Sequence, residues 1–550
     1  MKPNHIRIMF LIAIGIMFVS LMGKWEQTFP AQDSPAQPTQ QEQDNSHYDV
    51  KDQSSQATTD KSAIESKKAD FSKFDSSKTV DVNTKVFKDL KVSLTDGAII
   101  SASLKDYNVS LDDKTPMPLL TDESGSEYMA KSTIVVNKQP VSINYTSQGI
   151  KKQDGKEILT LVGSADGVQV TRTYTFDDAK YAISVAQKIT NTTASPVDVI
   201  LDNSLVRDFD PEGASFSLLN AHSYTFTGVA YSTKDKKFMK ESFKDISKMS
   251  KKPETVDDVG QGWVSFIQHY FMTAWIPQST DSTLYYKNLG NDVYEAGEFS
   301  YNKVAPNASF DSTSVLYAGP IIKNNIADLA PNLDRALDYG MLSFFSKIIF
   351  VVMSWIHSVV GNWGLAIILV TVIIKAIFYP LSAKSYRSMA KMRMLQPRIK
   401  RLQEQHKDDK SQLGPKMMQL YKEEKVNPLS GCLPMIIQIP IFISLYWVLL
   451  ESVELRQSPF IFWIHDLSMK DPFFVLPILM GASMFVQQRL SPAPADPMQA
   501  KVMMFLPLMF TFLFASFPAG LVLYWLTNNV ISILQQWTIT KRFEAAHKKK

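Results

Sequence analysis

The sequence predicts a membrane protein with two structural parts, a large antiparallel β-sandwich and an α-helical core of five transmembrane helices with an additional N-terminal anchor helix. Three observations lead to this fold class. Apolar runs of membrane-spanning length dominate the chain from Met341 to Trp537. Short alternating runs separated by turn pairs occupy roughly 80–318. The Lys and Arg residues lie beside the apolar runs, where they report topology.

The composition excludes several classes of protein. A chain of 550 residues is too long for one domain. The formal net charge of +4 is too small to indicate nucleic acid, so no DNA partner is expected. The single cysteine, Cys432, excludes an intrachain disulfide. Because no nucleophile elbow, phosphate loop or zinc motif occurs, we expect no catalytic residues, cofactor, metal or enzymatic function.

The N-terminal apolar run at 8–23 allows two interpretations, a cleaved signal peptide or an uncleaved anchor. No A-x-A cleavage site follows the run, and Trp25 supplies an interfacial ring. We therefore expect a transmembrane signal anchor at 6–25 whose N-terminus lies in the cytoplasm. Residues 26–79 are polar with few aromatics, which predicts a disordered periplasmic linker.

Residues 80–329 carry the strand pattern. Alternating runs such as 181–185 and 197–201 are separated by turn pairs, of which Asp96-Gly97 and Asp166-Gly167 are examples. This pattern predicts a periplasmic β-sandwich domain. The segment 330–360 changes from charged to aromatic residues and predicts an interfacial amphipathic helix.

Five apolar runs follow, and the charges of the connecting segments orient them. The segment 384–428 holds twelve Lys/Arg against five Asp/Glu, so it should be cytoplasmic, whereas 451–471 holds two against four and should be periplasmic. Both termini are then cytoplasmic. The predicted segments are a span at 361–383, a basic helical hairpin at 384–428, a span at 429–450, a periplasmic loop at 451–471, a span at 472–489, a cytoplasmic loop at 490–501, spans at 502–517 and 519–540, and a basic tail at 541–550.

Lys375 is the sharpest functional signal, because it lies inside an apolar run. Along a continuous helix it would be about 13 Å from Lys384, near the middle of a hydrocarbon core about 30 Å thick. Such a lysine should face water or an opposite charge, and the other predicted spans place no acidic residue at that depth.

Other polar residues recur at helical spacing and predict a polar groove around this lysine. The alternative is that Lys375 reaches the cytoplasmic headgroups and that the polar groups join helices to one another. The first stripe contains Thr371, Lys375, Tyr379 and Ser382; the second contains Tyr524, Asn528, Ser532 and Gln535; Gln438 and Gln487 lie in two other spans.

Two further segments leave their role open. In the hairpin, Met389, Met392, Leu395 and Ile399 share one side, and Met417 follows a break expected at Gly414-Pro415. These methionines suit either varied apolar partners or an ordinary hairpin core. The Phe- and Met-rich run 502–517 could form an apolar surface for the helix of another membrane protein, or it could face lipid.

Several motifs together resemble the YidC/Oxa/Alb family of membrane protein insertases, in its long Gram-negative form. The resemblance is specific over about 330–542 and weaker over the β domain. The motifs are Gly361-Asn362-Trp363-Gly364, Tyr379-Pro380-Leu381, Met389-Ala390-Lys391-Met392, Leu395-Gln396-Pro397, Lys425-Val426-Asn427-Pro428, Glu454-Leu455-Arg456-Gln457, Trp463-Ile464-His465-Asp466-Leu467 and Phe517-Pro518-Ala519-Gly520-Leu521.

The resemblance implies an inner-membrane insertase and chaperone that works both alone and with the Sec translocon. It implies a β-supersandwich and a hydrophilic groove that receives a client's polar segment. The implied partners are nascent membrane proteins and Sec with its accessory subunits, while the basic faces of the hairpin and C-terminal tail suit membrane lipids and the ribosome. The polar stripes and the resemblance together predict a client-binding groove, to which the resemblance itself assigns Lys375, Thr371 and Trp525. The groove residues are Lys375, Thr371, Tyr379, Gln438, Tyr524, Trp525, Asn528 and Ser532, and the residues along which a client helix is expected to slide are Met503, Phe505, Phe510 and Phe512.

The sequence departs from the family pattern at two groove positions. Lys375 stands where the family usually has Arg, and Trp525 stands where it has Tyr. Lysine keeps the charge but lacks the bidentate fork of arginine, which would weaken carboxylate capture.

Two competing functions remain open at this stage. An ion-coupled transporter would use Lys375 as a gating charge, but it predicts inverted repeats and intramembrane carboxylates, and neither occurs. A carbohydrate-binding or carbohydrate-modifying periplasmic domain would leave the groove unexplained, and fold analogy alone does not indicate a sugar site.

Overall fold

The chain is represented by a computed structural model. The predicted anchor at 6–25 and nearly all of the predicted linker at 26–79 lie outside the residues that it describes. The described residues are 78–123, 126–177, 180–209, 225–249, 254–256, 262–406, 410–424, 426, 433–491 and 497–548.

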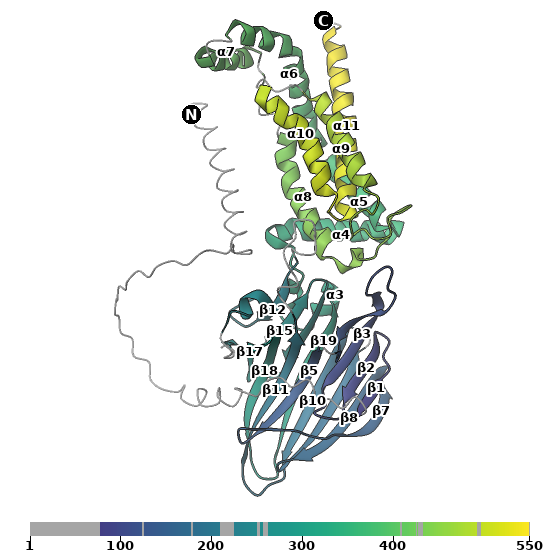
Figure 1. The fold of residues 1–550 in the computed structure, drawn as a ribbon, viewed down its shortest axis with the longest axis vertical. Coiled ribbons are helices and arrows are strands. Elements are labelled where there is room, and N and C mark those ends of the chain that lie inside the picture. The colour runs from purple at the N-terminus through teal and green to yellow at the C-terminus, as the bar shows by residue number, and fades with distance from the viewer. Residues whose placement is uncertain are drawn as a thin grey trace, which may run out of the picture. The chain divides into compact units, whose positions relative to one another are not determined.

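The described strands form two antiparallel sheets (Figure 1). The first sheet follows the path β1 (Thr79–Val82), β2 (Phe87–Ser93), β3 (Ile99–Asn108), β5 (Tyr128–Val136), β11 (Val197–Asp208), β18 (Val293–Val304), β17 (Ser282–Gly290) and β14 (Glu254–Val256), with β4 (Pro116–Leu120) on β3 and β6 (Gln139–Val141) on β5.

The second sheet packs against the first, and one hydrophobic core contains residues of both. Leu201 and Leu205 of β11 are buried there with residues of the second sheet such as Val170 and Phe176. The predicted antiparallel β-sandwich is therefore confirmed. The second sheet follows the path β13 (Met239–Ser242), β12 (Thr227–Ser232), β15 (Trp263–Gln268), β16 (Phe271–Pro277), β19 (Ser309–Pro320), β10 (Ala182–Asn191), β9 (Val168–Asp177), β8 (Lys156–Ala165) and β7 (Thr146–Gln153).

The two turn pairs chosen from the sequence have the backbone that a tight hairpin turn requires. Asp166 and Gly167 have φ of 47° and 78° and join β8 to β9, whose Ala165 and Val168 pair directly. Asp96 and Gly97 both have φ of 64° between β2 and β3. Two consecutive positive φ values match the twist of the flanking strands, which explains the Asp-Gly signal.

A buried polar network joins the two sheets and was not predicted from the sequence. The Arg172 guanidinium of β9 donates to Gln187 Oε1 at 2.8 Å and to the Ser132 carbonyl of β5 at 2.9 Å. Gln187 Nε2 donates to Asn203 Oδ1 at 3.0 Å, and Asn203 Nδ2 donates to Glu298 Oε1 at 2.7 Å. Because each buried polar group has a partner, the network is compatible with a packed core.

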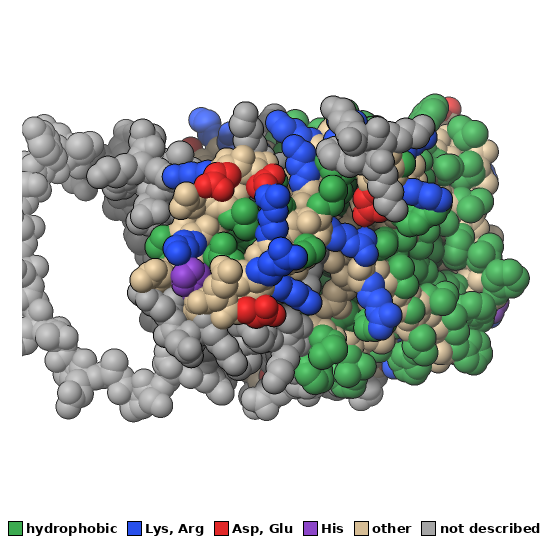
Figure 2. Space-filling model, turned by 90° about the horizontal axis from the view of Figure 1, so that it is seen from above, with side chains coloured by type: hydrophobic (Ala, Val, Ile, Leu, Met, Phe, Trp, Pro, Cys, Tyr) green, Lys and Arg blue, Asp and Glu red, His purple; other side chains and the backbone are tan. Residues whose placement is uncertain are grey.

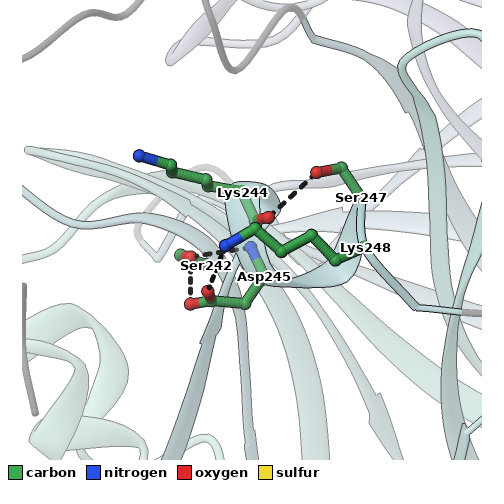
Figure 3. A network of polar contacts seen from close by, with 5 residues as sticks. All are labelled: Ser242, Lys244, Asp245, Ser247 and Lys248. Carbon is green, nitrogen blue, oxygen red and sulfur yellow. Dashed lines mark hydrogen bonds and ion pairs between the residues drawn. The ribbon is translucent and has the colours of Figure 1, made fainter. Parts of the chain in front are cut away.

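Two short helices accompany the sheets, α2 (Phe243–Ile246) and α3 (Lys323–Ile326). Figure 3 shows how side chains stabilise α2: the Asp245 backbone N–H donates to Ser242 Oγ at 3.1 Å, and Lys248 lies 3.9 Å from the Asp245 carboxylate. This N-cap satisfies an orphan donor of the first turn, so the cluster has a structural explanation.

The second half of the chain is helical. The 3₁₀ helices η4 (Leu333–Ala336) and η5 (Gly340–Leu342) lead into it, and η7 (Val453–Leu455) follows α8. Its α-helices are α4 (Ser343–Val360), α5 (Trp363–Ile377), α6 (Tyr379–Gln405), α7 (Lys410–Glu423), α8 (Leu433–Glu451), α9 (Val475–Leu490), α10 (Pro497–Phe514) and α11 (Ala519–Lys548).

Helix α4, Ser343–Val360, occupies the second part of the segment predicted as an interfacial helix at 330–360, and η4 and η5 occupy the first part. Figure 1 shows it running across the long axes of α5, α8 and α11. Its outer side chains are apolar and exposed, for example Phe344 at 71% and Val359 at 72%. An exposed apolar face on a transverse helix fits a position within the membrane interface.

Length and composition identify fewer spans than the sequence pattern does. Among the described residues, one helix, Gly340–Val360, is long and apolar enough to cross a membrane alone. Helices Trp363–Ile377 and Tyr379–Gln405 pass the same test together but are bent by 69°, and the apolar helices Ile436–Glu451 and Met503–Phe514 are shorter. The helical core is observed, whereas the count of five spans stays a prediction.

The predicted span at 361–383 is wrong as one continuous helix. Helix α5 ends at Ile377 and α6 begins at Tyr379, with the 69° bend between them. Pro380 lacks the N–H that would bond the carbonyl of Ala376, and its ring conflicts with that carbonyl. A hydropathy window does not register this lost donor, so the break was missed.

One expectation about a helix break needs correction, and one helix is longer than the predicted span. Helix α7 runs from Lys410 to Glu423 straight through Gly414 and Pro415, where a break was expected. Helix α11 extends to Lys548, so the segment 541–548 of the predicted tail is helical. Basic residues near a helix C-terminus favour such an extension.

Candidate functional site

Lys375 lies in the last turn of α5. Asn362 starts this helix, since its side chain accepts a hydrogen bond from the Leu365 N–H at 3.0 Å. At 1.5 Å per residue, Lys375 is about 18 Å along the axis from Trp363, or somewhat more than half of a core about 30 Å thick. The depth estimated from Lys384 assumed an unbroken helix, but the count from Trp363 gives a similar position.

The ammonium of Lys375 has a neutral hydrogen-bond partner. Its Nζ donates to Ser532 Oγ of α11 at 2.8 Å, and only 9% of Lys375 is exposed. Within the described part of the chain, no carboxylate lies within 4.0 Å of this Nζ. The unpaired cation expected from the sequence is therefore present among these residues.

The predicted stripe around Lys375 is only partly assembled. Thr371 is buried, and its hydroxyl donates to the Ile367 carbonyl at 2.6 Å within α5. Ser382 is buried on α6. Tyr379 lies beyond the break and is 44% exposed, so it does not continue the stripe of α5.

The stripe on α11 is largely buried. Tyr524, Asn528 and Ser532 are all less than 9% exposed, and Ser532 Oγ donates to the Asn528 carbonyl at 2.7 Å. Asn528 Oδ1 and Gln535 Oε1 are buried and have no hydrogen-bond partner among the described residues. Buried acceptors without protein partners are places where water or a ligand donor is favoured.

Helix α8 contributes a polar and an aromatic contact to this region. Gln438 Nε2 donates to the Tyr524 hydroxyl. Phe442 packs edge-on against Trp525 with ring centroids 4.7 Å apart, and Phe514 of α10 lies 5.2 Å from Trp525. Gln438, Tyr524 and Trp525 therefore lie where α8 and α11 meet, and Trp525 is part of an aromatic cluster.

A second polar contact, between α9 and α11, was missed from the sequence. Asn529 Nδ2 donates to Ser483 Oγ at 3.0 Å, and Gln536 Nε2 donates to the Leu490 carbonyl at 3.0 Å. Asn529 directly follows Asn528, so the two side chains point about 100° apart on the helix. Two adjacent amides in an apolar run were the available signal.

The proposed slide residues do not share one face of α10. Met503, Phe505 and Phe512 are 39%, 64% and 75% exposed. Phe510 is half-buried against Trp525, with ring centroids 6.3 Å apart. Phe505 and Phe512 instead line an apolar crevice of about 630 Å³ between α9 and α10, whose other lining residues are Phe474, Pro477, Ile478, Leu508, Met509, Thr511 and Ala515.

The helical hairpin of α6 and α7 has its own small core. Leu395, Ile399 and Val426 are buried in it, with Met392 and Met417 packed against them. These methionines therefore form an ordinary hairpin core, which was one of the two alternatives. Figure 2 shows Lys and Arg side chains gathered over the end of the molecule that carries this hairpin.

The fold and this geometry together define a class of protein. A β-sandwich adjoins a bundle of apolar helices, and a buried lysine within the bundle is held by a neutral hydroxyl. This combination is typical of helical membrane proteins with a large extramembrane domain.

Comparisons with known proteins give the family. The model described as 60Kd inner membrane protein matches residues 355–548, and the model described as YidC periplasmic domain matches residues 79–352. Proteins named membrane protein insertase YidC from Francisella philomiragia and Francisella tularensis subsp. novicida are each 72% identical over 100% of both chains. The chain belongs to the YidC family, an inner-membrane family with a periplasmic domain.

The solved structures that match include that of an active YidC insertase with its first transmembrane domain resolved. It is 20% identical and has a TM-score of 0.37, and the match covers 83% of this chain and 93% of that chain.

Proposed function

We propose that this chain inserts other proteins into the inner membrane, and that Lys375 receives the polar or acidic segment of the client. The single observation that carries this proposal is the buried ammonium of Lys375, whose partner among the described residues is a neutral hydroxyl at 2.8 Å. A buried cation without a counter-charge is costly unless water or an anion reaches it. A client carboxylate supplies that anion during translocation.

The neighbouring polar atoms support a wet site. Asn528 Oδ1 and Gln535 Oε1 lie buried on α11, and no described residue hydrogen-bonds them. Water at these acceptors would lower the free energy of bringing a client's polar segment into the bilayer. The proposed groove thus lies between α5, α8 and α11.

Short helices support local thinning of the bilayer. The 15 residues of α5 and the 16 residues of α9 extend only about 22 Å and 24 Å, less than a core of about 30 Å. A thinner bilayer shortens the apolar path that the client's polar segment must cross. Partition of the client's apolar helix into lipid then supplies the driving force, without a nucleotide.

We further propose six spans, with both termini in the cytoplasm and the β domain in the periplasm. The client's apolar helix would slide along exposed side chains such as Phe505 and Phe512. The basic hairpin and C-terminal helix would contact the ribosome and anionic lipids, and the β domain would assist contacts with Sec and its accessory subunits.

Lys375→Glu tests the proposal. Because the substitution places a negative charge where the client's carboxylate must bind, we expect insertion of a single-span client with an acidic tail to fall roughly ten-fold. Purified full-length protein in proteoliposomes and protease protection of the tail give the measurement.

Two controls define the result. Lys375→Arg keeps the charge and should retain insertion, and a client whose tail acids are changed to amides should be much less sensitive to Lys375→Glu. Equal insertion of the acidic-tailed client by Lys375→Glu and the unmodified chain would reject the proposal.

A further inference from the structure

We infer that Ser532 is a positioning residue for Lys375, and that it holds the ammonium between α5 and α11 with two N–H donors left for a client carboxylate. This inference rests on the proposed function. In this inference Ser532 acts by holding Lys375 in place and does not itself contact the client.

The serine hydroxyl is fixed as an acceptor. Ser532 is 2% exposed, and its hydroxyl hydrogen points to the Asn528 carbonyl at 2.7 Å. A hydroxyl has one hydrogen, so this back-bond leaves its lone pairs for Lys375 Nζ at 2.8 Å. The acceptor is therefore set by the backbone of α11.

Helix α6 packs against α11 close to this hydrogen bond. Tyr386 of α6 is 4% exposed and lies in one apolar cluster with Ile539 of α11. Ile539 is about two turns beyond Ser532 on α11. The hydrogen bond between Lys375 and Ser532 is therefore flanked by a buried contact between α6 and α11.

Lysine needs such a fixed partner more than arginine does. Its ammonium is a compact charge on a flexible four-carbon stem, which can swing toward the headgroups. An ammonium has three donors, so one bond to Ser532 leaves two for the oxygens of a carboxylate. Without the serine acceptor, we expect the ammonium to leave the depth at which clients bind it.

The experiment uses Ser532→Ala and Ser532→Cys in full-length protein in proteoliposomes. Alanine removes the acceptor, and cysteine keeps the shape of the side chain, with a somewhat larger atom, while supplying only a weak acceptor. Both should lower insertion of an acidic-tailed client several-fold and leave an amide-tailed client within two-fold, with little change in the melting temperature of the protein in detergent.

Thr527→Val is the matched control variant. Thr527 lies on the same helix and makes the same kind of back-bond, from Oγ1 to the Leu523 carbonyl at 2.8 Å. Loss of the Thr527 hydroxyl should leave insertion of both the acidic-tailed and the amide-tailed client unchanged. If Thr527→Val reproduces the Ser532 defect, the effect belongs to α11 in general and the inference is overturned.

A double variant separates positioning from structure. If Ser532 acts through Lys375, then Ser532→Ala should add no further loss in a Lys375→Met background. An additional loss there, or an equal loss for both clients, would overturn the inference. Impairment by Lys375→Met with none by Ser532→Ala would overturn this inference alone, whereas normal insertion by Lys375→Met would overturn the proposed function as well.

Discussion

At the scale of single residues, a buried tyrosine of the β domain connects two acids. The Tyr285 hydroxyl lies 2.8 Å from Asp202 Oδ1 and 3.0 Å from Glu295 Oε1, and Lys287 Nζ lies 2.8 Å from Glu295 Oε2. A hydroxyl has one hydrogen, so both contacts are hydrogen bonds only if one acid is protonated. Burial and then the Glu295 charge raise the pKa of Asp202 to about 7. Burial opposes ionisation of Glu295, but the Lys287 ammonium holds its pKa below the ordinary value.

This arrangement predicts a pH dependence of stability. Between the ordinary pKa of 3.8 and the folded value of about 7, folded Asp202 keeps a proton that the unfolded chain has lost. The free energy of unfolding should therefore fall as pH rises through this window, by a few kcal/mol, and level off above it. Thermal melts of the full-length protein in detergent, followed by the β-sheet circular dichroism signal from pH 5 to 8, measure it.

Asp202→Asn should flatten this dependence, because the amide does not titrate. Asp198→Asn is the matched control, since the half-buried Asp198 on the same strand also accepts a hydrogen bond from a tyrosine, Tyr301, at 2.8 Å. An unchanged slope in Asp202→Asn would show that another group binds the proton.

Single residues also show what sequence reasoning can reach. Lys375 was identified because a charge inside an apolar run is conspicuous, and Ser532 because it recurs at helical spacing with Asn528. Asn529 was missed because its partner, Ser483, lies 46 residues away on another helix. Which of two adjacent amides faces which neighbour depends on helix packing, and one sequence does not specify that packing.

At the scale of elements, a glycine sets the distance between α9 and α10. A Cβ added to Gly481 would lie 1.9 Å from Thr511 Oγ1 and 3.2 Å from Thr511 Cβ. The Thr511 hydroxyl already donates to the Pro507 carbonyl at 2.7 Å. Small residues permit such close approach of helices in membranes.

Gly481→Val should therefore push α9 and α10 apart and destabilise the helical core by about 1–3 kcal/mol. Ala482→Val, at the exposed neighbouring position, should have little effect. The helical melting temperature in detergent provides the comparison, and equal values for the two variants would show that the helices do not depend on this contact.

Elements differ in how well the sequence predicts them. The hairpin turn at Asp166-Gly167 follows from backbone preference within two residues. The break between α5 and α6 was missed because hydropathy averages side chains and ignores the missing N–H of Pro380. The opposite error occurred at Pro415, where a proline was expected to break the helix but α7 continues through it.

At the scale of the whole molecule, the β-sandwich and the helical core place their apolar side chains in different ways. The β-sandwich buries its core by strand alternation between two sheets, while the helical core exposes apolar faces such as those of α4 and α10. The sequence separated these parts because period-two and long apolar patterns are distinct. It did not predict that Lys375 would be almost enclosed, since burial depends on how α5 and α11 pack.

Photo-crosslinking from position 438 tests the central account most directly, because it leaves the Lys375 ammonium in place. Gln438 of α8 contacts Tyr524 at the proposed groove, and a photoactivatable residue there should capture the acidic tail of a stalled client. One at the outward-facing Val372, which is 44% exposed, should capture mainly lipid. Client adducts at 438 that decline when the tail acids become amides, or when Lys375→Met removes the ammonium, would agree with carboxylate capture. Client adducts at 372 with none at 438 would contradict it.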